Sequence, residues 1–344
     1  MTDFEHSLMI ISSTEAAKLL SDDVQDDADT GADFELRQVS VPVHYHAERL
    51  DRALAGIVPE FSRSYLQQLI EAESVQLNGQ IVTKSSTRVK AGHDLRIELK
   101  PTLQSQAFKP ESMQLEVIFK DDFLLVINKP AGLVVHPAPG NWSGTLLNGL
   151  LAYDSQAALL PRAGIVHRLD KDTSGLMVVA RQRQTMDQLV GMISARSVSR
   201  QYIALAHGEW KGPATRQVDW PVGRDPRNRL KMAVVNLDKT AGKTALTTIS
   251  LLQTGSQHCL VQCKLHTGRT HQIRVHMSAL GHPLVSDALY GGQVFGSLKR
   301  QALHACHLSF EHPVTGSSLA FQSPLPADMD LEIVSAGLRY NQNA

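Results

Sequence analysis

Residues 164–181 read GIVHRLDKDTSGLMVVAR, a stretch of the 344-residue chain in which charge, turn formers and an apolar run follow one another directly. The turn formers Asp172–Gly175 come just before the apolar run Leu176–Ala180, which predicts a buried strand. Asp170 immediately precedes these turn formers. We therefore expect Asp170 to lie on a tight turn at a strand edge, held rigidly and exposed in a cleft.

An aspartate in this position can serve as a nucleophile, a base or a metal ligand. A calcium loop beginning at Asp170 would need a glutamate at its twelfth position, where this chain has Arg181. An aspartyl-phosphate enzyme would have an apolar strand before the loop, but His167 and Arg168 interrupt it and Thr173 comes one place early. The calcium site is excluded, and an Asp-nucleophile phosphotransferase stays as the alternative enzyme.

Five blocks of sequence in a fixed order carry a family resemblance. They are NKPAGLVVHPAPGN (128–141), HRLDKDTSGL (167–176), RSVSRQYIALAHG (196–208), LHTGRTHQIRVHMSALGHPLVSDALYGG (265–292) and RQALHACHLSFEHP (300–313). Together they resemble the RluA family of pseudouridine synthases, and the layout is most similar to members that act on 23S rRNA of the large ribosomal subunit. The resemblance implies an enzyme that isomerises uridine to pseudouridine by base flipping, without a cofactor. A non-catalytic RNA-binding or ribosome-assembly protein is the other alternative.

The resemblance also implies roles for individual residues. Asp170 is the expected nucleophile, Arg274 its charge partner, with Arg269 as competing candidate, and Tyr202 lies against the flipped uracil. A buried carboxylate needs such a partner to remain ionised, and arginine can bind both of its oxygens. The other expected contacts with the target nucleotide or RNA backbone are His167, Arg168, Leu303, Arg224, Arg227, Arg229 and Lys231.

The N-terminal part predicts a second, smaller domain. Leu50, Ala53, Leu54 and Ile57 have helical spacing, Ser62 can cap a second helix, and Asn78-Gly79 predicts a tight hairpin. This order resembles the S4 RNA-binding module. The basic residues expected to contact RNA there are Arg49, Arg52, Arg63, Lys84 and Arg88.

These signals predict an α+β protein with an S4-like module before a catalytic domain built on a large, mainly antiparallel mixed sheet. The expected boundaries are an acidic, disordered leader at 1–38, the S4-like domain at 39–100, a linker at 101–114, the catalytic domain at 115–338 and a tail at 339–344. Regular structure is expected to start near Val41.

Charge and cysteine content fit an RNA-binding protein of the cytoplasm. Net charge is zero, but residues 1–36 hold ten acidic groups and one basic group, which leaves 33 Lys and Arg against 24 Asp and Glu in the rest. A basic body suits a polyanionic partner. The three cysteines are expected to be reduced and buried. We expect no metal, no membrane segment and a monomer.

Overall fold

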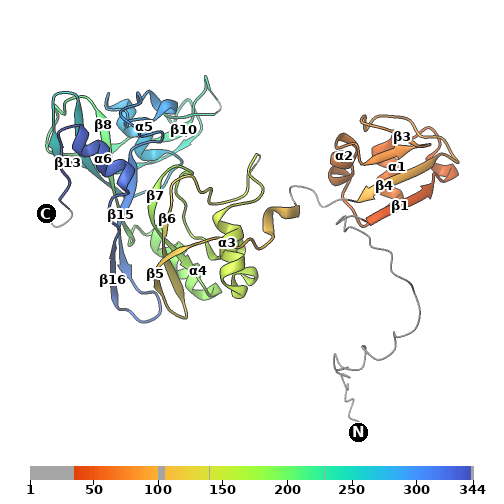
Figure 1. Cartoon of the computed structure of the whole chain (residues 1–344), viewed down its shortest axis with the longest axis horizontal. Helices are drawn as coiled ribbons and strands as arrows, with labels where there is room; N and C mark the ends of the chain where they lie inside the picture. Colours follow the sequence, from red (N-terminus) through yellow and green to blue (C-terminus); the bar gives the residue numbers. More distant parts are fainter. Residues whose placement is uncertain (1–34, 100–104, 139, 229, 342–344) are drawn as a thin grey trace, which may run out of the picture. The chain divides into compact units, whose positions relative to one another are not determined.

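The computed structural model describes residues 35–99, 105–138, 140–228 and 230–341. These residues form two compact units that divide at position 101 (Figure 1). Each unit has its own apolar core. No helix in the described ranges is both long and apolar enough to cross a lipid bilayer.

The first unit packs two helices on a four-stranded sheet. The helices are α1 (Leu50–Ile57) and α2 (Arg63–Glu71), and the sheet order is β1 (Glu35–Ser40), β4 (Asp94–Leu99), β2 (Val75–Leu77) and β3 (Gln80–Ile81). The Ser62 side chain accepts the N–H of Tyr65 and so caps α2. Asn78 and Gly79 join β2 to β3 with positive φ angles of 52° and 76°. Both helices and the hairpin are as predicted.

Strand β1 corrects the predicted start of regular structure. It begins at Glu35, within the expected leader and before Val41, and it pairs antiparallel with β4 from Glu35 opposite Leu99 to Ser40 opposite Asp94. Its apolar residues, Leu36 and Val39, are three positions apart, so no apolar alternation marks the strand in the sequence. Hydrogen bonding to a distant strand, rather than local pattern, makes this segment regular. The rest of the leader, residues 1–34, lies outside the described residues.

The second unit is built on a nine-stranded sheet. Its order is β5 (Glu116–Lys120), β6 (Leu124–Lys129), β7 (Ser174–Ala180), β15 (Leu303–Glu311), β8 (Ser199–His207), β14 (His258–Leu265), β13 (Leu246–Thr254) and β9 (Thr215–Asp219), with β16 (Ser318–Gln322) beside β15. Only the β7–β15 pair is parallel among these described strands. A small second sheet joins β11 (Met232–Val234), β10 (Val222–Arg224) and β12 (Gly242–Lys243). The predicted α+β architecture with a mainly antiparallel mixed sheet is confirmed.

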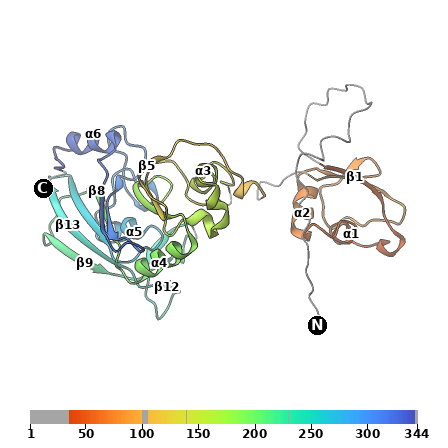
Figure 2. The ribbon, with the colours of Figure 1, turned by 90° about the horizontal axis from the view of Figure 1, so that it is seen from below.

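Both faces of the large sheet are covered at its central strands. Helix α5 (Gln272–Ala279) shares an apolar cluster with Tyr202 and Ala204 of β8. Helix α6 (Ala327–Ser335) shares a second cluster with Ile203 and Leu205, which point to the opposite face of that strand (Figure 2). The second unit also contains the helices α3 (Leu146–Tyr153) and α4 (Arg183–Ser194) and the 3-10 turns η2 (Ser105–Phe108), η3 (Ser155–Leu159), η4 (Pro161–Gly164) and η5 (Ala288–Tyr290). The 3-10 turn η1 (Val43–Tyr45) belongs to the first unit. Burial on both sides explains why the central strands read as continuous apolar runs.

The segment predicted as a linker is partly attached to the second unit. Ala107 in η2 is buried, and the Asn148 side-chain amide of α3 donates to the carbonyls of Ala107 at 3.3 Å and Lys109 at 2.8 Å. Two prolines and polar residues made this stretch look unstructured. Its order comes from contacts with a helix that lies much later in the chain.

Candidate active site

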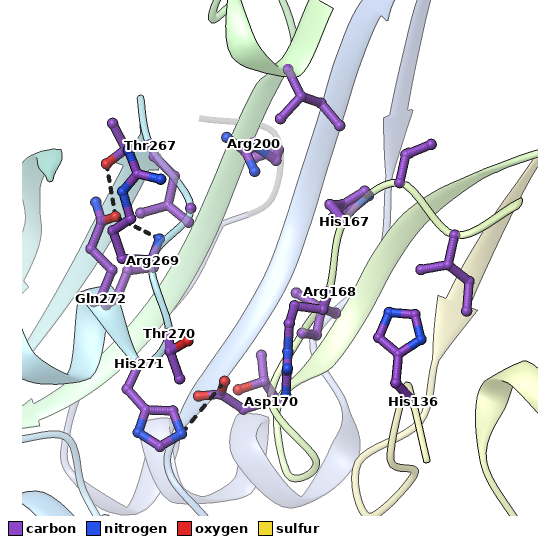
Figure 3. Close-up of a pocket in the computed structure, with 18 of the residues that line it drawn as sticks. His136, His167, Arg168, Asp170, Arg200, Thr267, Arg269, Thr270, His271 and Gln272 are labelled. Atoms are coloured by element: carbon purple, nitrogen blue, oxygen red, sulfur yellow. Dashed lines mark hydrogen bonds and ion pairs between the residues drawn. The ribbon is translucent and has the colours of Figure 1, made fainter. Parts of the chain in front are cut away.

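A cavity of about 1030 Å³ opens in the second unit around Asp170. The loop before β7, strand β8, the loop after β14 and the start of α5 form its walls (Figure 3). The charged residues that line it, within the described chain, are one carboxylate and six arginines, namely Asp170, Arg162, Arg168, Arg196, Arg200, Arg269 and Arg274. A concave surface with this charge balance favours an anionic ligand.

The loop that carries Asp170 is held by hydrogen bonds. The Thr173 N–H donates to the Asp170 carbonyl at 3.1 Å, and the Gly132 N–H donates to the Lys171 carbonyl at 2.9 Å. The ammonium of Lys129, a fully buried side chain, donates to the carbonyls of Pro130, Leu133 and Lys171 at 2.8, 3.0 and 3.0 Å.

Lys129 therefore matches its three N–H donors to three backbone acceptors. Burial lowers the pKa of Lys129 to about 7, and the carboxylates of Asp172 and Asp170 oppose that shift. Because one of its acceptors is the carbonyl of the residue after Asp170, the ammonium positions the loop that carries Asp170 without lining the cavity.

Arg274 connects Asp170 to a second carboxylate. Its Nη1 donates to Asp170 Oδ2 at 3.0 Å, while Nε and Nη2 donate to the two oxygens of Asp287 at 2.7 and 2.8 Å. The Asp287 side chain is 1% exposed and that of Asp170 is 17% exposed. Burial lowers the pKa of Arg274, but its bonds to Asp287 and Asp170 outweigh burial and raise it. Arg274 is thus a fixed cation, clamped from behind by Asp287 and presented to Asp170.

His271 approaches Asp170 from the start of α5. Its Nε2 lies 3.8 Å from Asp170 Oδ1, and its Nδ1 is 2.7 Å from the Tyr290 hydroxyl (Figure 3). That hydroxyl accepts the Met232 N–H, so it can donate its own proton to Nδ1. Burial lowers the pKa of His271, and the Asp170 carboxylate opposes this only in part. The hydrogen bonds fit a neutral imidazole with its proton on Nε2, facing Asp170.

Tyr202 and Leu303 form an apolar wall of the cavity. They are 4% exposed each and come from adjacent strands β8 and β15. Burial raises the pKa of Tyr202 to about 12, so its side chain is a neutral phenol at physiological pH. Arg168 is exposed at the cavity and lies beside Asp170 (Figure 3).

His167 is tied to the sheet. Its Nε2 accepts the N–H of Val178 in β7 at 3.1 Å. Burial lowers the pKa of His167 to about 3, so the ring is neutral. This contact favours structural support over substrate contact, two roles that the sequence left equal.

The structure places the other predicted residues in different ways. Arg269 lines the cavity, but its Nε donates to the Thr244 carbonyl at 3.0 Å, and Arg274 is the arginine that contacts Asp170. The described members of the basic loop, Arg224, Arg227 and Lys231, do not line the cavity. Arg229 lies outside the described residues.

Two of the predicted basic residues of the first unit, Arg49 and Arg63, bind a buried aspartate. Asp51 is fully buried and accepts from Arg49 at 3.0 and 3.2 Å, from Arg63 at 3.1 and 2.7 Å and from Gln67 at 2.7 Å. Burial alone would raise the pKa of Asp51, but these donors hold it well below its usual value.

The other three predicted basic residues, Arg52, Lys84 and Arg88, lie at the surface of that unit. The backbones of Arg49 and Arg88 meet in a short bridge, and the Arg88 guanidinium donates to the Ala47 carbonyl at 2.7 Å. Arg52 and Lys84 are exposed.

The sequence analysis did not single out the lining residue Arg200, and it also missed three residues that act around Asp170. Asp287, Lys129 and His271 all lie in family-like blocks, so the blocks marked them without indicating their contacts. Each acts on a partner that is remote in the sequence. Only Asp287 could have been anticipated, and on chemical grounds. A buried arginine that binds one carboxylate through a single nitrogen has further N–H donors, which a second carboxylate can accept.

The described residues offer no cluster of metal ligands, and the cysteines are buried. Within the described ranges, no group of three or more His, Cys, Asp or Glu side chains is arranged to hold a metal ion. Cys259, Cys263 and Cys306 are buried and free, as predicted.

Comparisons with known proteins agree with this geometry. Residues 123–279 match the family model of RNA pseudouridylate synthases, and residues 48–95 match the S4 domain. The ribosomal large subunit pseudouridine synthase D of Neisseria meningitidis is 44% identical over 321 residues, which cover 89% of this chain and 84% of that protein. The synthase D of Xanthomonas campestris is 43% identical over 89% of this chain and 94% of its own.

A solved structure supports the same assignment. Human RNA pseudouridylate synthase domain containing 1 is 27% identical and superposes with a TM-score of 0.51, covering 65% of this chain and 89% of its own. Identity of this level over nearly the whole length of the bacterial relatives shows the family. The chain belongs to the RNA pseudouridine synthases and is an isomerase with an N-terminal S4 domain.

Proposed function

We propose that this enzyme isomerises specific uridines in the RNA of the large ribosomal subunit, 23S rRNA or a precursor particle, with Asp170 as nucleophile. The relatives from Neisseria and Xanthomonas, named for that subunit, support the substrate. The observation that carries the catalytic assignment is Asp170 itself, the one carboxylate among the described lining residues, held by an Arg274 that Asp287 clamps.

The reaction breaks the bond between uracil N1 and ribose C1′, turns the base and joins C5 to C1′. C5 loses its proton and N1 gains one, so the product is an isomer of the substrate. Asp170 would attack C1′ or C6, or remove the C2′ proton; the three routes make the same demand for an ionised carboxylate beside the sugar. Arg274 keeps that carboxylate charged and oriented. Tyr202 and Leu303 offer a neutral, apolar wall to the base, which must be retained while it is free of the sugar.

Extrusion of the target nucleotide from the RNA costs a few kcal/mol. Contacts around the cavity must compensate for it, and Arg168, beside Asp170 and exposed, is suited to hold the RNA in the extruded form. Arg269 and the basic loop are proposed to contact the backbone. The S4 domain is proposed to add affinity through Arg49, Arg52, Arg63, Lys84 and Arg88. We further propose that the enzyme acts in the cytoplasm. We also propose that it is a monomer, and light scattering at assay concentration tests this through the molar mass.

The test combines mapping with a single substitution. Pseudouridines in large-subunit RNA are mapped in cells that lack the protein and in cells supplied with wild type or Asp170→Asn. Wild type should restore the missing sites and Asp170→Asn should restore none, because an amide is no nucleophile here. Purified wild type, assayed on a small unstructured RNA with EDTA, should remain active. Substantial product from purified, folded Asp170→Asn would remove Asp170 from this role.

A further inference from the structure

Arg200 is a buried cation for which the described chain provides no counter-charge. It lies on β8, and the whole residue is 6% exposed. Its Nε is buried without a hydrogen-bond partner. Among the described ion pairs and hydrogen bonds, none involves its guanidinium. Burying an unpaired charge is expensive, so such a group is retained where a ligand supplies the missing charge.

The surroundings of Arg200 hold a space for such a ligand. Arg200 lines the same cavity as Asp170, and its Nη1 lies 3.0 Å from the point where a Cβ on Gly268 would stand. Figure 3 shows it between the Thr267–Arg269 segment and His167, well apart from Asp170 in this view. The glycine of the TGRTH segment therefore leaves room for the guanidinium, and Arg196 and Arg269 add two more cations to the lining.

Among the residues that the structure describes, no acidic side chain is free to neutralise this part of the cavity. Asp170, the one acidic residue among the described lining, is bonded to Arg274. His167 is neutral, because burial and the charge of Arg200 both lower its pKa. The described lining therefore supplies no anion for Arg200, and an RNA substrate carries phosphates that can.

The spacing of Arg200 and Tyr202 along β8 indicates which part of the RNA Arg200 contacts. Arg200 and Tyr202 are two residues apart, so their side chains leave the strand on the same face, separated by about 6.6 Å along it. Tyr202 stands where the proposed function needs the uracil. A second contact at this separation falls on the backbone of the same nucleotide or its neighbour.

We propose that Arg200 binds a backbone phosphate of the RNA at the target nucleotide, as the buried anchor that fixes the register of the ribose against Asp170. This inference rests on the proposed function and adds a phosphate contact to it. Arginine is suited to this role because its planar head can donate two parallel hydrogen bonds to phosphate oxygens. Arg200 is thus a binding and positioning residue, distinct from the groups that carry out the bond exchange.

The main test replaces one phosphate at a time with an uncharged methylphosphonate in a short RNA that wild type modifies. At one position near the target, wild type should lose about 10- to 100-fold in affinity, the range for a hydrogen bond to a charged group. Arg200→Met should bind the RNA with all its phosphates more weakly than wild type does, by a similar factor. Its affinity should not fall further when that methylphosphonate is introduced. Arg183→Met is the matched control, since Arg183 is an exposed arginine paired with Asp187 outside the cavity.

Two further variants separate the contact from folding. Gly268→Ala crowds the guanidinium without touching its charge, so it should weaken the same methylphosphonate effect while Arg200 remains present. Arg200→Lys should recover only part of the affinity. Thermal unfolding of each variant checks the fold. If Arg200→Met is folded and remains as sensitive as wild type to methylphosphonate at every position, the phosphate contact is wrong.

A second arm needs no turnover. The Arg200 Nε–H NMR signal, assigned by its loss in Arg200→Met, is followed during titration with uridine 3′,5′-bisphosphate and with uridine. The bisphosphate should shift it in a saturable way and uridine should not; an unmoved signal would overturn the proposal. Absence of pseudouridine formation would instead defeat the proposed function and leave this arm to decide on Arg200.

Discussion

Arg274 bonds two carboxylates, and only one of them faces the cavity. Asp287 takes two of its nitrogens and Asp170 a third. Removing the arginine therefore leaves a nearly inaccessible carboxylate at Asp287 without its partner, in addition to freeing Asp170.

We expect Arg274→Ala to be both inactive and less stable by about 3–5 kcal/mol, as for other broken buried pairs. Arg274→Lys should recover part of each, because an ammonium cannot reproduce the planar two-point contact with Asp287. Single-turnover assays and urea unfolding measure the two effects. Arg269→Ala is the control, since its Nε bonds a carbonyl rather than a carboxylate. Equal losses of activity and stability in both alanine variants would refute the distinction between them.

At the scale of elements, the loop that carries Asp170 depends on how β7 pairs with β15. These strands are parallel only at His304 opposite Ser174 and Ala305 opposite Gly175. Gly175 has φ of 120°, and a Cβ there would stand 2.3 Å from the Ala305 carbonyl oxygen. The glycine of the HRLDKDTSGL block thus permits the backbone approach that brings β7 beside the closing strand.

Gly175→Ala should consequently destabilise the second unit by roughly 3 kcal/mol or more, since both the φ angle and the contact must change. Gly191→Ala is a matched control in α4, where nothing lies within 4 Å of the added carbon. It should stabilise by about 0.5–1 kcal/mol through helix propensity. Denaturant unfolding of the two variants measures this, and similar stabilities would show that the β7–β15 junction tolerates a side chain.

For the whole molecule, we expect the first unit to add RNA affinity and the second unit to carry the chemistry. The first unit has a separate core and surface arginines oriented by Asp51, while the cavity lies within the second. Deleting residues 1–100 should weaken binding to structured RNA and leave the chemical step on a minimal RNA little changed.

The deletion should also flatten the salt dependence of binding. Each lost phosphate contact removes about 0.9 from the log–log slope if duplex RNA behaves as B-DNA does. Binding measured at several salt concentrations tests this, with Asp170→Asn full chain as the control that keeps every phosphate contact. An unchanged slope would locate the main RNA surface on the second unit.

The second unit should also lose stability as the pH falls. Burial is the first cause that lowers the pKa of His136 to about 4, of His167 to about 3 and of His304 to about 4. A histidine in the unfolded chain titrates near pH 6.5. Below that pH these side chains are protonated in the unfolded chain and stay neutral in the folded chain. Above about pH 6.5 the neutral rings do not reduce the free energy of unfolding. As the pH falls toward 4, the free energy of unfolding decreases by up to about 1.4 kcal/mol per pH unit for each ring.

His167→Gln tests this slope, because glutamine can still accept the Val178 N–H but does not titrate. Urea unfolding at pH 7.5, 6.5 and 5.5 should show a shallower fall for His167→Gln than for wild type. His44→Gln, at an exposed site in the first unit, should leave the slope unchanged. A slope equal to wild type in His167→Gln would mean that His167 charges without unfolding.

The sequence by itself determined what local chemistry can encode. The Ser62 cap, the Asn78-Gly79 hairpin and the apolar run of β7 depend on neighbours within a few residues, so their pattern was sufficient. The same is true of Asp170 on its turn, and the ordered blocks were specific enough to indicate the family.

Only the tertiary structure decided which groups meet. Arg274 and Asp170 are 104 residues apart, and the choice of Arg274 over Arg269, the clamp by Asp287 and the solitary burial of Arg200 all depend on how α5 and β8 pack around the cavity. Strand β1 likewise exists because β4 supplies its hydrogen bonds. Burial and through-space charge are properties of the folded surroundings, and no local pattern of residue types contains them.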